Sequence, residues 1–98
     1  MTIIRQPAVY ILTNEPRGTL YTGVTSNLIQ RVYQHKSNAT DGFTKKYTCK
    51  YLVYYELYQT MLDAISREKQ LKGGSRIKKI KLIENNNPSW IDLYPMII

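Results

Sequence analysis

The sequence contains a single cysteine, Cys49, among its 98 residues. One thiol cannot form a disulfide within the chain, and it cannot supply the several cysteines of a cysteine-clustered zinc site. Scarcity of cysteine is typical of proteins that work in a reducing compartment. We therefore expect a cytoplasmic protein without structural disulfides.

Long apolar runs are also missing from the chain. No stretch approaches the roughly 18 consecutive apolar residues that a membrane-spanning helix requires. Near the N-terminus, Pro7 interrupts MTIIRQPAVYIL where a signal peptide would be continuously apolar, and no cleavage site of small residues follows. We predict no membrane-spanning segment, no secretion signal and no membrane partner.

Acidic residues are few. Fourteen Lys and Arg against seven Asp and Glu give a formal net charge of +7 and a pI near 9.6. Half of the basic residues lie between residues 67 and 81, where Glu68 is the one acid. Such a cluster holds phosphates through counterion release, whatever the base sequence. An anionic partner such as nucleic acid is therefore expected, and the alternative is a basic surface that serves solubility.

The apolar content of 43% is sufficient for one core, and 98 residues fit one domain, predicted over residues 1–98. Apolar runs at residues 8–12 and 20–25, separated by a segment with Pro16 and Gly18, predict a β-hairpin. The run at residues 51–58 is rich in β-branched and aromatic residues and predicts a third strand.

Helices are expected between and after these strands. A first helix, capped by Thr25 or Ser26, should end near Lys36. Its predicted apolar face consists of Leu28, Ile29 and Val32. Thr60 and Asp63 resemble a capping box that opens a second helix over residues 61–72, ended by the glycines that follow.

A third helix is expected after Ser75, which can cap it. It carries Ile77, Ile80 and Ile83 near one another and should end before residues 85–88. The apolar tail at residues 90–98 is expected to fold back and cover part of the protein. The order β-β-α-β-α-α predicts a compact α+β fold.

Glu68 conflicts with a purely structural interpretation of the second helix. On a helical wheel at about 100° per residue, it lies within the apolar stripe that includes Met61, Ala64 and Leu71. A buried carboxylate is unfavourable unless it is paired, hydrogen-bonded or bound to a metal. Three interpretations stay open: an ion pair with a core-facing arginine, a solvent-exposed rim position, and a functional carboxylate in a cleft.

Two further groups of residues have a chemical alternative to simple packing. Arg31 and His35 are four residues apart and share a helix face, where arginine can bind phosphate and histidine can relay protons. The alternative is an ordinary solvated helix face, which has the same spacing.

Tyr10 and Tyr21 lie in the two hairpin strands, and Gly23 follows Tyr21 by two residues. A glycine within a strand marks either a close approach of a backbone or ligand, or a bulge.

These residues combine into a recognisable pattern. Ala8-Val9-Tyr10, followed after ten residues by Tyr21-Thr22-Gly23, resembles the paired motif of the GIY-YIG endonuclease superfamily. Arg31, His35 and Glu68 stand at matching positions in the expected strand and helix order. The segments FTKKY, AISREKQLK and NPSWIDLYP resemble those of the superfamily's small stand-alone members.

The resemblance implies a three-stranded antiparallel sheet flanked by helices, and metal-dependent cleavage of phosphodiester bonds. It implies that Glu68 holds one divalent cation, Mg²⁺ or Mn²⁺, together with phosphate and water oxygens. Tyr10 would help to deprotonate the attacking water, while Tyr21 and Arg31 would contact the scissile phosphate. His35 would assist proton transfer. Gly23 would let the backbone pack closely at the site.

The chain departs from the superfamily pattern at several positions. Ala8, Val9 and Thr22 replace motif residues with small or β-branched ones. Val24 stands where the excision-repair nucleases carry a lysine that favours ionisation of the tyrosine, so more of that help must come from the metal, Arg31 or His35. A family asparagine corresponds to one of residues 85–87.

We therefore expect a nucleic-acid-binding endonuclease that acts on DNA, as repair nucleases do. One alternative is a binding module that keeps the fold without cleaving, and another is a protein-interaction domain in which Glu68 is structural. The residues expected to contact nucleic acid are Lys45, Lys46, Lys69, Lys72, Arg76, Lys78 and Lys79.

Overall fold

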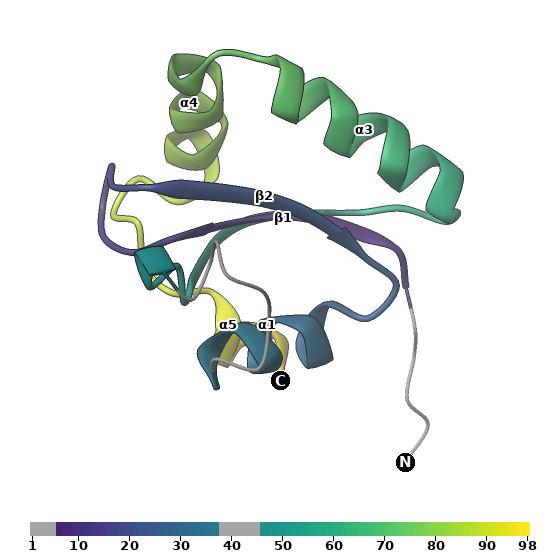
Figure 1. Ribbon diagram of the computed structural model, residues 1–98, viewed down its shortest axis with the longest axis horizontal. Helices are drawn as coiled ribbons and strands as arrows, with labels where there is room; N and C mark the ends of the chain where they lie inside the picture. Colours follow the sequence, from purple (N-terminus) through teal and green to yellow (C-terminus); the bar gives the residue numbers. More distant parts are fainter. Residues whose placement is uncertain (1–5, 38–45) are drawn as a thin grey trace.

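The computed structural model describes residues 6–37 and 46–98. Its strands, β1 (Ala8–Thr13), β2 (Leu20–Thr25) and β3 (Tyr51–Leu57), form an antiparallel sheet in the order β2-β1-β3. Helices α3 (Met61–Gly73) and α4 (Arg76–Asn86) cover one face of the sheet, and α1 (Leu28–Lys36) and α5 (Tyr94–Ile97) cover the other (Figure 1). The predicted α+β fold is confirmed.

The central strand β1 is buried along its whole length. Because side chains alternate between the two faces of a strand, β1 supplies both cores. Tyr10 and Leu12 belong to a cluster with residues of α1 and α5. Val9 packs with residues of α3, and Ile11 packs with residues of α4. The strand therefore links the two layers of helices.

The start of α1 differs from the prediction. Asn27 caps the helix, because its side chain accepts a hydrogen bond from the Gln30 backbone N–H at 3.2 Å. Thr25, one of the two predicted caps, has its hydroxyl bound to the Asn27 backbone N–H at 3.0 Å. The prediction of Thr25 or Ser26 is therefore wrong by one or two residues, because Thr25 forms the turn before the helix.

The predicted caps of the later helices are confirmed. The Thr60 hydroxyl accepts from the Asp63 backbone N–H, and the Ser75 hydroxyl accepts from the Lys78 backbone N–H, both at 3.2 Å. Helix α3 reaches residue 73 and α4 reaches residue 86, each slightly beyond its predicted end.

The apolar helix faces are narrower than predicted. Ile29 on α1 is 45% exposed and Ile77 on α4 is 65% exposed. The buried stripe of α1 consists instead of Leu28, Val32 and His35. This stripe follows the i, i+4, i+7 spacing of a helix face that packs against a sheet, and it brings a histidine into the core.

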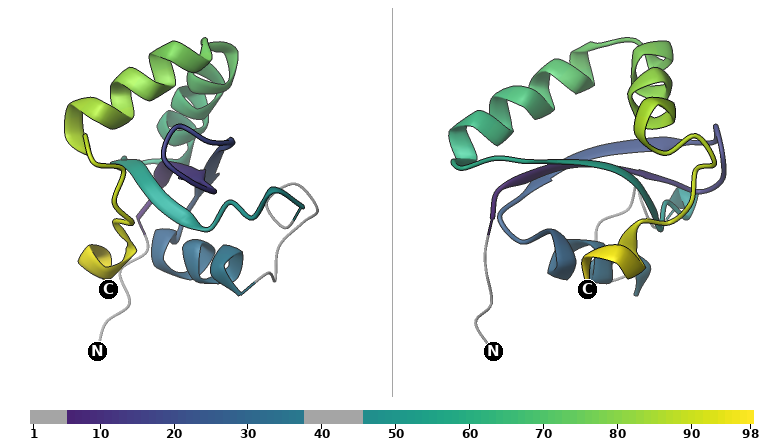
Figure 2. Two further views of the ribbon diagram at one scale, coloured as in Figure 1. Left: turned by 90° about the vertical axis from the view of Figure 1, so that its left-hand side faces the viewer. Right: turned by 180° about the vertical axis from the view of Figure 1, so that it is seen from behind.

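The C-terminal tail folds back as predicted. Leu93, Tyr94 and Ile97 pack against the core cluster on the α1 side. The Leu93 backbone N–H donates to the Leu52 carbonyl at 2.7 Å, which ties the tail to β3. Seen from behind, α5 lies beside α1 on the same face (Figure 2).

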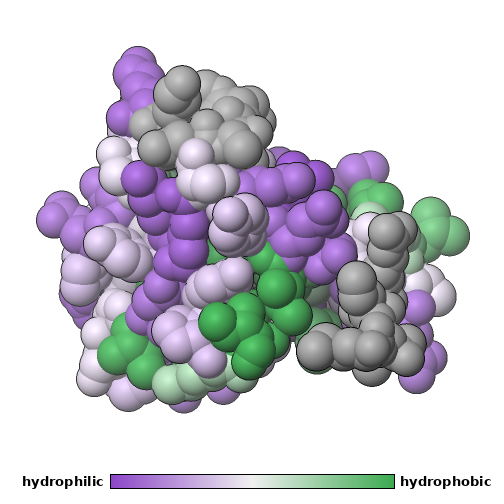
Figure 3. Space-filling view, turned by 90° about the horizontal axis from the view of Figure 1, so that it is seen from below, coloured by the Kyte–Doolittle hydropathy of each residue, from purple (hydrophilic) through white to green (hydrophobic). Residues whose placement is uncertain are grey.

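Apolar residues are partly exposed on the α1 and α5 side. A hollow of about 350 Å³ lies there between α1, β3 and α5, and its lining includes Ile29, Leu57 and Ile97. The space-filling view from this side shows apolar residues gathered near its centre (Figure 3). None of the helices in the described part of the chain has the length and apolar character needed to cross a membrane.

Candidate active site

Three aromatic rings meet on the α1 face of the sheet. In the β1–β2 register Tyr10 pairs with Gly23, and Leu12 pairs with Tyr21. The rings of Tyr10 and Tyr21 lie with centroids 6.3 Å apart, and the His35 ring lies 5.8 Å from the first and 5.5 Å from the second. Sequence-distant residues from β1, β2 and α1 thus form one cluster.

A hydrogen bond joins the phenol of Tyr10 to the imidazole of His35. The Tyr10 Oη and His35 Nε2 atoms are 3.0 Å apart, and the two residues are only 2% and 3% exposed. Which atom donates depends on the imidazole tautomer. In either case the pair forms a direct path along which a proton can move between phenol and imidazole.

Gly23 makes room for the Tyr10 ring. A Cβ atom at this position would lie 2.5 Å from both Cζ and Oη of Tyr10, well inside van der Waals contact. The need is for space, since Gly23 does not have a positive φ angle. The close approach at Gly23 is therefore made by a tyrosine side chain, in a regular β1–β2 register, and not by the backbone, ligand or bulge that the sequence suggested.

Arg31 lies on α1, one helical turn before His35. Its side chain is exposed, whereas His35 is buried. On a wheel at about 100° per residue, the two positions differ by only about 40°. Arg31 is thus an exposed cation on the same side of α1 as His35.

Glu68 lies on α3, on the other face of the sheet. Its side chain is 14% exposed, and one carboxylate oxygen forms an ion pair with Lys72 Nζ at 3.0 Å. This partner is a lysine one turn along the same helix, so the pair differs from the core-facing arginine considered from the sequence. The structure does not place Glu68 in the ring cluster.

The direction of Glu68 follows from its neighbours on α3. Ala64 and Leu71 are the buried residues of the helix, and at about 100° per residue Arg67 and Glu68 flank them on opposite sides. Arg67 contacts Glu56 of β3. The flank with Glu68 therefore faces the opposite edge of the sheet, formed by β2. Helix α3 packs on β2 and β1.

An ionic network fixes the other flank of α3 to β3. The Glu56 carboxylate accepts hydrogen bonds from Arg67 Nε and Nη2 at 2.9 and 3.1 Å, from the Tyr58 hydroxyl at 2.6 Å, and from the Tyr54 hydroxyl. Burial alone would raise the pKa of Glu56, but the bonds from Arg67 and the two tyrosines outweigh it and lower that pKa. Burial and the neighbouring carboxylate raise the pKa of Tyr54 to about 12.

A divalent metal fits Glu68 only with ligands from outside the protein. Among residues 6–37 and 46–98, no three His, Cys, Asp or Glu side chains lie together as a metal site. Mg²⁺ is commonly held by one or two carboxylates while water and substrate phosphates fill its other positions. A single, largely enclosed carboxylate is compatible with such a site, provided that the metal replaces Lys72 as its partner.

Val24, at the position of the missing lysine, faces α3. It packs against the cluster formed by Val9, Ala64 and Leu71. Its side chain is therefore on the face of β2 opposite to Tyr21, and an apolar residue suits this position.

The predicted nucleic-acid contacts are spread over α3 and α4. Lys69 and Lys72 are exposed on α3, and Arg76 and Lys78 are exposed on α4, whereas Lys79 is half-buried. Lys46 is also exposed, with Nζ 5.4 Å from the Tyr47 ring centroid. Lys45 lies outside the described residues.

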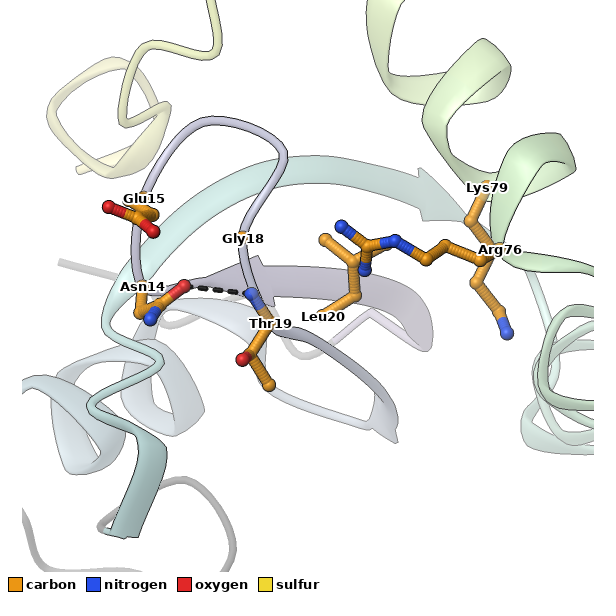
Figure 4. Close-up of a pocket in the computed structure, with 7 residues that line it drawn as sticks. All are labelled: Asn14, Glu15, Gly18, Thr19, Leu20, Arg76 and Lys79. Atoms are coloured by element: carbon orange, nitrogen blue, oxygen red, sulfur yellow. Dashed lines mark hydrogen bonds between the residues drawn. The ribbon is translucent and has the colours of Figure 1, made fainter.

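A basic pocket of about 500 Å³ lies between the β1–β2 turn and α4 (Figure 4). Arg76 extends toward the turn and donates a hydrogen bond to the Arg17 carbonyl, while the Glu15 side chain points away from Arg76. The turn is held against α4 by Arg17, which donates to both oxygens of Glu84 at 2.9 and 2.8 Å. Sequence reasoning did not identify this pocket, because the turn and α4 are far apart in the chain.

A second basic cleft, between α3 and α4, was only partly anticipated. It is lined by the predicted residues Lys78 and Lys79, and also by Lys81 and Gln70, which were not among the predicted contacts. Lys78 and Lys81 are three residues apart, a spacing that places both on one side of a helix. That spacing is the signal that could have included Lys81.

Asn87 is the buried residue of the three asparagines at positions 85–87. Its side-chain amide donates to the Val53 and Ile91 carbonyls at 3.2 and 2.8 Å, and its carbonyl oxygen accepts from the Ile91 backbone N–H at 3.1 Å. Asn87 therefore joins the end of α4 to β3 and to the tail. Its contacts are structural.

The sequence model of the GIY-YIG catalytic domain matches residues 6–81. The chain is a member of the GIY-YIG family. Membership supports a nuclease-type function and nucleic-acid binding in general. Tyr10 and Tyr21, which resemble the paired tyrosines of the family motif, form the ring cluster together with His35.

Small UPF0213 proteins are similar to this GIY-YIG chain. One from Pediococcus pentosaceus is 39% identical over 75 residues, which cover 76% of this chain and 79% of that protein. One from Staphylococcus aureus is 37% identical over 67 residues, covering 68% and 82%. A solution NMR structure of a UPF0213 protein from Bacillus halodurans has a TM-score of 0.55 and 25% identity, covering 94% of this chain and 97% of that one. The likeness thus includes both the sequence and the fold of small GIY-YIG proteins.

Proposed function

We propose that this GIY-YIG protein is an endonuclease that hydrolyses phosphodiester bonds of DNA with one bound Mg²⁺ or Mn²⁺. The observation that carries the proposal is the buried hydrogen bond between Tyr10 Oη and His35 Nε2. A phenol ordinarily loses its proton only near pH 10. With a neighbouring imidazole as acceptor, it can take up a proton from water at neutral pH while passing its own proton on.

In this proposal Tyr10 removes the proton of the attacking water, and His35 receives the proton that Tyr10 releases. Tyr21 and Arg31 bind the scissile phosphate at the solvent side of the cluster. Arginine suits this role because its planar guanidinium can form two parallel hydrogen bonds with a phosphate. Gly23 keeps the Tyr10 ring in position.

Glu68 would hold the metal ion, which would supply positive charge to stabilise the negative charge that develops on the phosphate. The carboxylate faces the β2 edge of the sheet from the α3 side, whereas the rings face it from the α1 side. The proposal therefore requires the nucleic acid to pass around this edge, so that the metal at Glu68 and the ring cluster act on the same phosphate. Lys72 then has to release Glu68 and becomes available for a neighbouring phosphate.

A second candidate function is a nucleic-acid-binding module that does not cleave. The ion pair between Glu68 and Lys72 favours it, because a carboxylate with a cationic partner is already neutralised. Under this alternative the basic surface of α3 and α4 would bind nucleic acid, and the ring cluster would only stabilise the fold.

Cleavage assays with Glu68→Gln separate the two functions. Single-stranded, duplex, flap and branched DNA and RNA are incubated with wild type, with and without Mn²⁺, and the active substrate is then tested with the variant. We expect cleavage by wild type only with metal, and none by Glu68→Gln. Asp63→Asn is the matched control, because Asp63 is an exposed acid on the same helix, and it should retain activity.

The stability of Glu68→Gln tests the structural interpretation. An ion pair at this spacing with a partly exposed lysine contributes only about 0.3 to 0.5 kcal/mol. The free energy of unfolding of the variant in metal-free buffer should therefore lie within about 0.5 kcal/mol of the wild-type value. A much larger loss would show that the carboxylate holds the fold, and metal-independent cleavage by the variant would contradict the site.

A further inference from the structure

The cleft between α3 and α4 has features of a ligand site in its own right. Its volume is about 430 Å³, within the range of small-molecule pockets. It lies on the α3 and α4 face of the sheet, away from the ring cluster of Tyr10 and His35. We propose that it binds one sugar-phosphate unit of a nucleic-acid strand, at a distance from the bond that is cleaved. The inference rests on the proposed action on nucleic acid and extends it.

The charge of the cleft favours a phosphate. Lys78, Lys79 and Lys81 line it, and none of the three forms an ion pair with a carboxylate of residues 6–37 or 46–98. No Asp or Glu is among the described residues that line the cleft. Arg67 also lines the cleft, but Glu56 already neutralises its guanidinium. Three lysines without acidic partners produce a local positive field that attracts a phosphodiester.

The lining of the cleft also fits the sugar next to that phosphate. The half-buried Leu82 supplies the apolar surface that the ring carbons of a sugar can cover, since Leu71 is only 5% exposed. Gln70 and Asn85 supply amide groups. The Gln70 carbonyl oxygen already accepts from Arg67 Nη1 at 3.1 Å, so its NH₂ group is the part left to donate to a ligand oxygen.

The position of the cleft makes it a binding site without a chemical role. Its lining includes neither Glu68, which would hold the metal, nor a residue of the ring cluster. Removing charge from the cleft should therefore raise KM and leave kcat unchanged. Such contacts position the nucleic acid and do not read its sequence.

NMR titration of the full chain tests the cleft directly. The side-chain amide signals of Gln70 and Asn85 are followed while ribose 5-phosphate, ribose or inorganic phosphate is added to metal-free protein. The test variant is Lys78→Gln/Lys81→Gln, in which two exposed lysines are replaced. The control Lys50→Gln removes a lysine charge outside the cleft, at a position that is not among the predicted nucleic-acid contacts.

We expect ribose 5-phosphate to shift both amides saturably in wild type and in the control. Its affinity should fall about tenfold or more in Lys78→Gln/Lys81→Gln, because two attractive contacts are lost. Ribose alone should leave the signals unmoved. Equal affinity for inorganic phosphate and ribose 5-phosphate would overturn the sugar-phosphate assignment. Unmoved amides in wild type, or the same affinity in both variants, would overturn the site.

A short DNA oligonucleotide completes the test and keeps the two proposals apart. If the oligonucleotide is cleaved while the Gln70 and Asn85 signals do not shift, the proposed sugar-phosphate site is wrong and the proposed endonuclease activity is retained. If the oligonucleotide shifts the two amide signals but no substrate is cleaved under any condition, the proposed sugar-phosphate site is supported and the proposed hydrolysis is wrong.

Discussion

Replacing Gly23 with alanine perturbs the ring cluster with a single methyl group. The new Cβ would lie 2.5 Å from Cζ and from Oη of Tyr10, whereas ordinary van der Waals contact begins at 3.4 Å. The Tyr10 ring would have to move by about 0.9 Å, the difference between these two distances. That ring is 2% exposed and lies against Tyr21 and His35, so it has little room to move.

Two contributions determine the expected loss of stability in Gly23→Ala. Overpacking in a filled core costs about 1 to 3 kcal/mol. Displacement of the Tyr10 ring also weakens its hydrogen bond to His35, which contributes about 0.5 to 1.5 kcal/mol. We therefore expect the free energy of unfolding to fall by roughly 2 to 4 kcal/mol. For a domain of this size the Tm should fall by roughly 10 °C or more.

Urea denaturation of wild type, Gly23→Ala and a matched control measures this effect. The control is Gly73→Ala, because a Cβ at Gly73 would meet nothing within 4 Å. Gly73 ends a helix, so its replacement should stabilise the protein by about 0.4 to 1 kcal/mol. In a Tyr10→Phe background the contact with Oη is absent, so Gly23→Ala should lower the free energy of unfolding by less than it does in wild type. If Gly23→Ala is as stable as wild type and keeps the His35 imidazole signals, the close-packed cluster is wrong.

Two further predictions concern α3 and the basic surface. Glu56→Gln should lower the free energy of unfolding at pH 7 by roughly 1.5 to 3 kcal/mol, because Arg67 and two tyrosines lose a charged acceptor. Because the folded-state pKa of Glu56 is lowered, the stability that its charge contributes is present above its ordinary pKa of 4.5 and is lost as the pH falls below that value. Urea denaturation from pH 3 to 7 should therefore show a smaller loss of stability in acid for Glu56→Gln than for wild type. The same dependence of stability on pH in both proteins would contradict the network. Nucleic-acid affinity should fall steeply as the salt concentration rises. The slope of log affinity against log salt concentration should shrink by roughly one for each contacting lysine or arginine removed. An affinity that does not depend on salt would exclude α3 and α4 as the phosphate-binding surface.

Local signals explain how much of the fold was predictable. The hairpin, the third strand and the order of the elements followed from apolar runs separated by turn residues. Thr60 and Ser75 cap their helices as predicted, because a hydroxyl at that position satisfies a backbone N–H of the first turn. Asn27 was missed because Thr25 and Ser26 are equally good caps, and the choice depends on the turn that leaves β2.

Long-range placement explains what the sequence left open. His35 is polar and was weighed as part of a solvated face, yet it is buried because Tyr10 of β1 gives its imidazole a hydrogen-bond partner. The helical wheel placed Glu68 in the apolar stripe, but it could not show that Lys72 pairs with it or that α3 crosses the face opposite to α1. The hydrogen bonds of Asn87 depend on β3, which is distant in the chain.

The most direct test of the proposed mechanism compares the cleavage rates of wild type and Tyr10→Phe on one DNA substrate with saturating Mn²⁺ in single turnover. The wild-type rate should rise with pH through the neutral range, and the variant should be slower by about a hundredfold or more, with DNA affinity little changed. Tyr33→Phe is the control, because Tyr33 is 61% exposed on α1, and it should cleave like wild type. Equal rates for wild type and Tyr10→Phe would show that the Tyr10–His35 pair does not carry the proton, and the non-cleaving binding module would then replace the endonuclease.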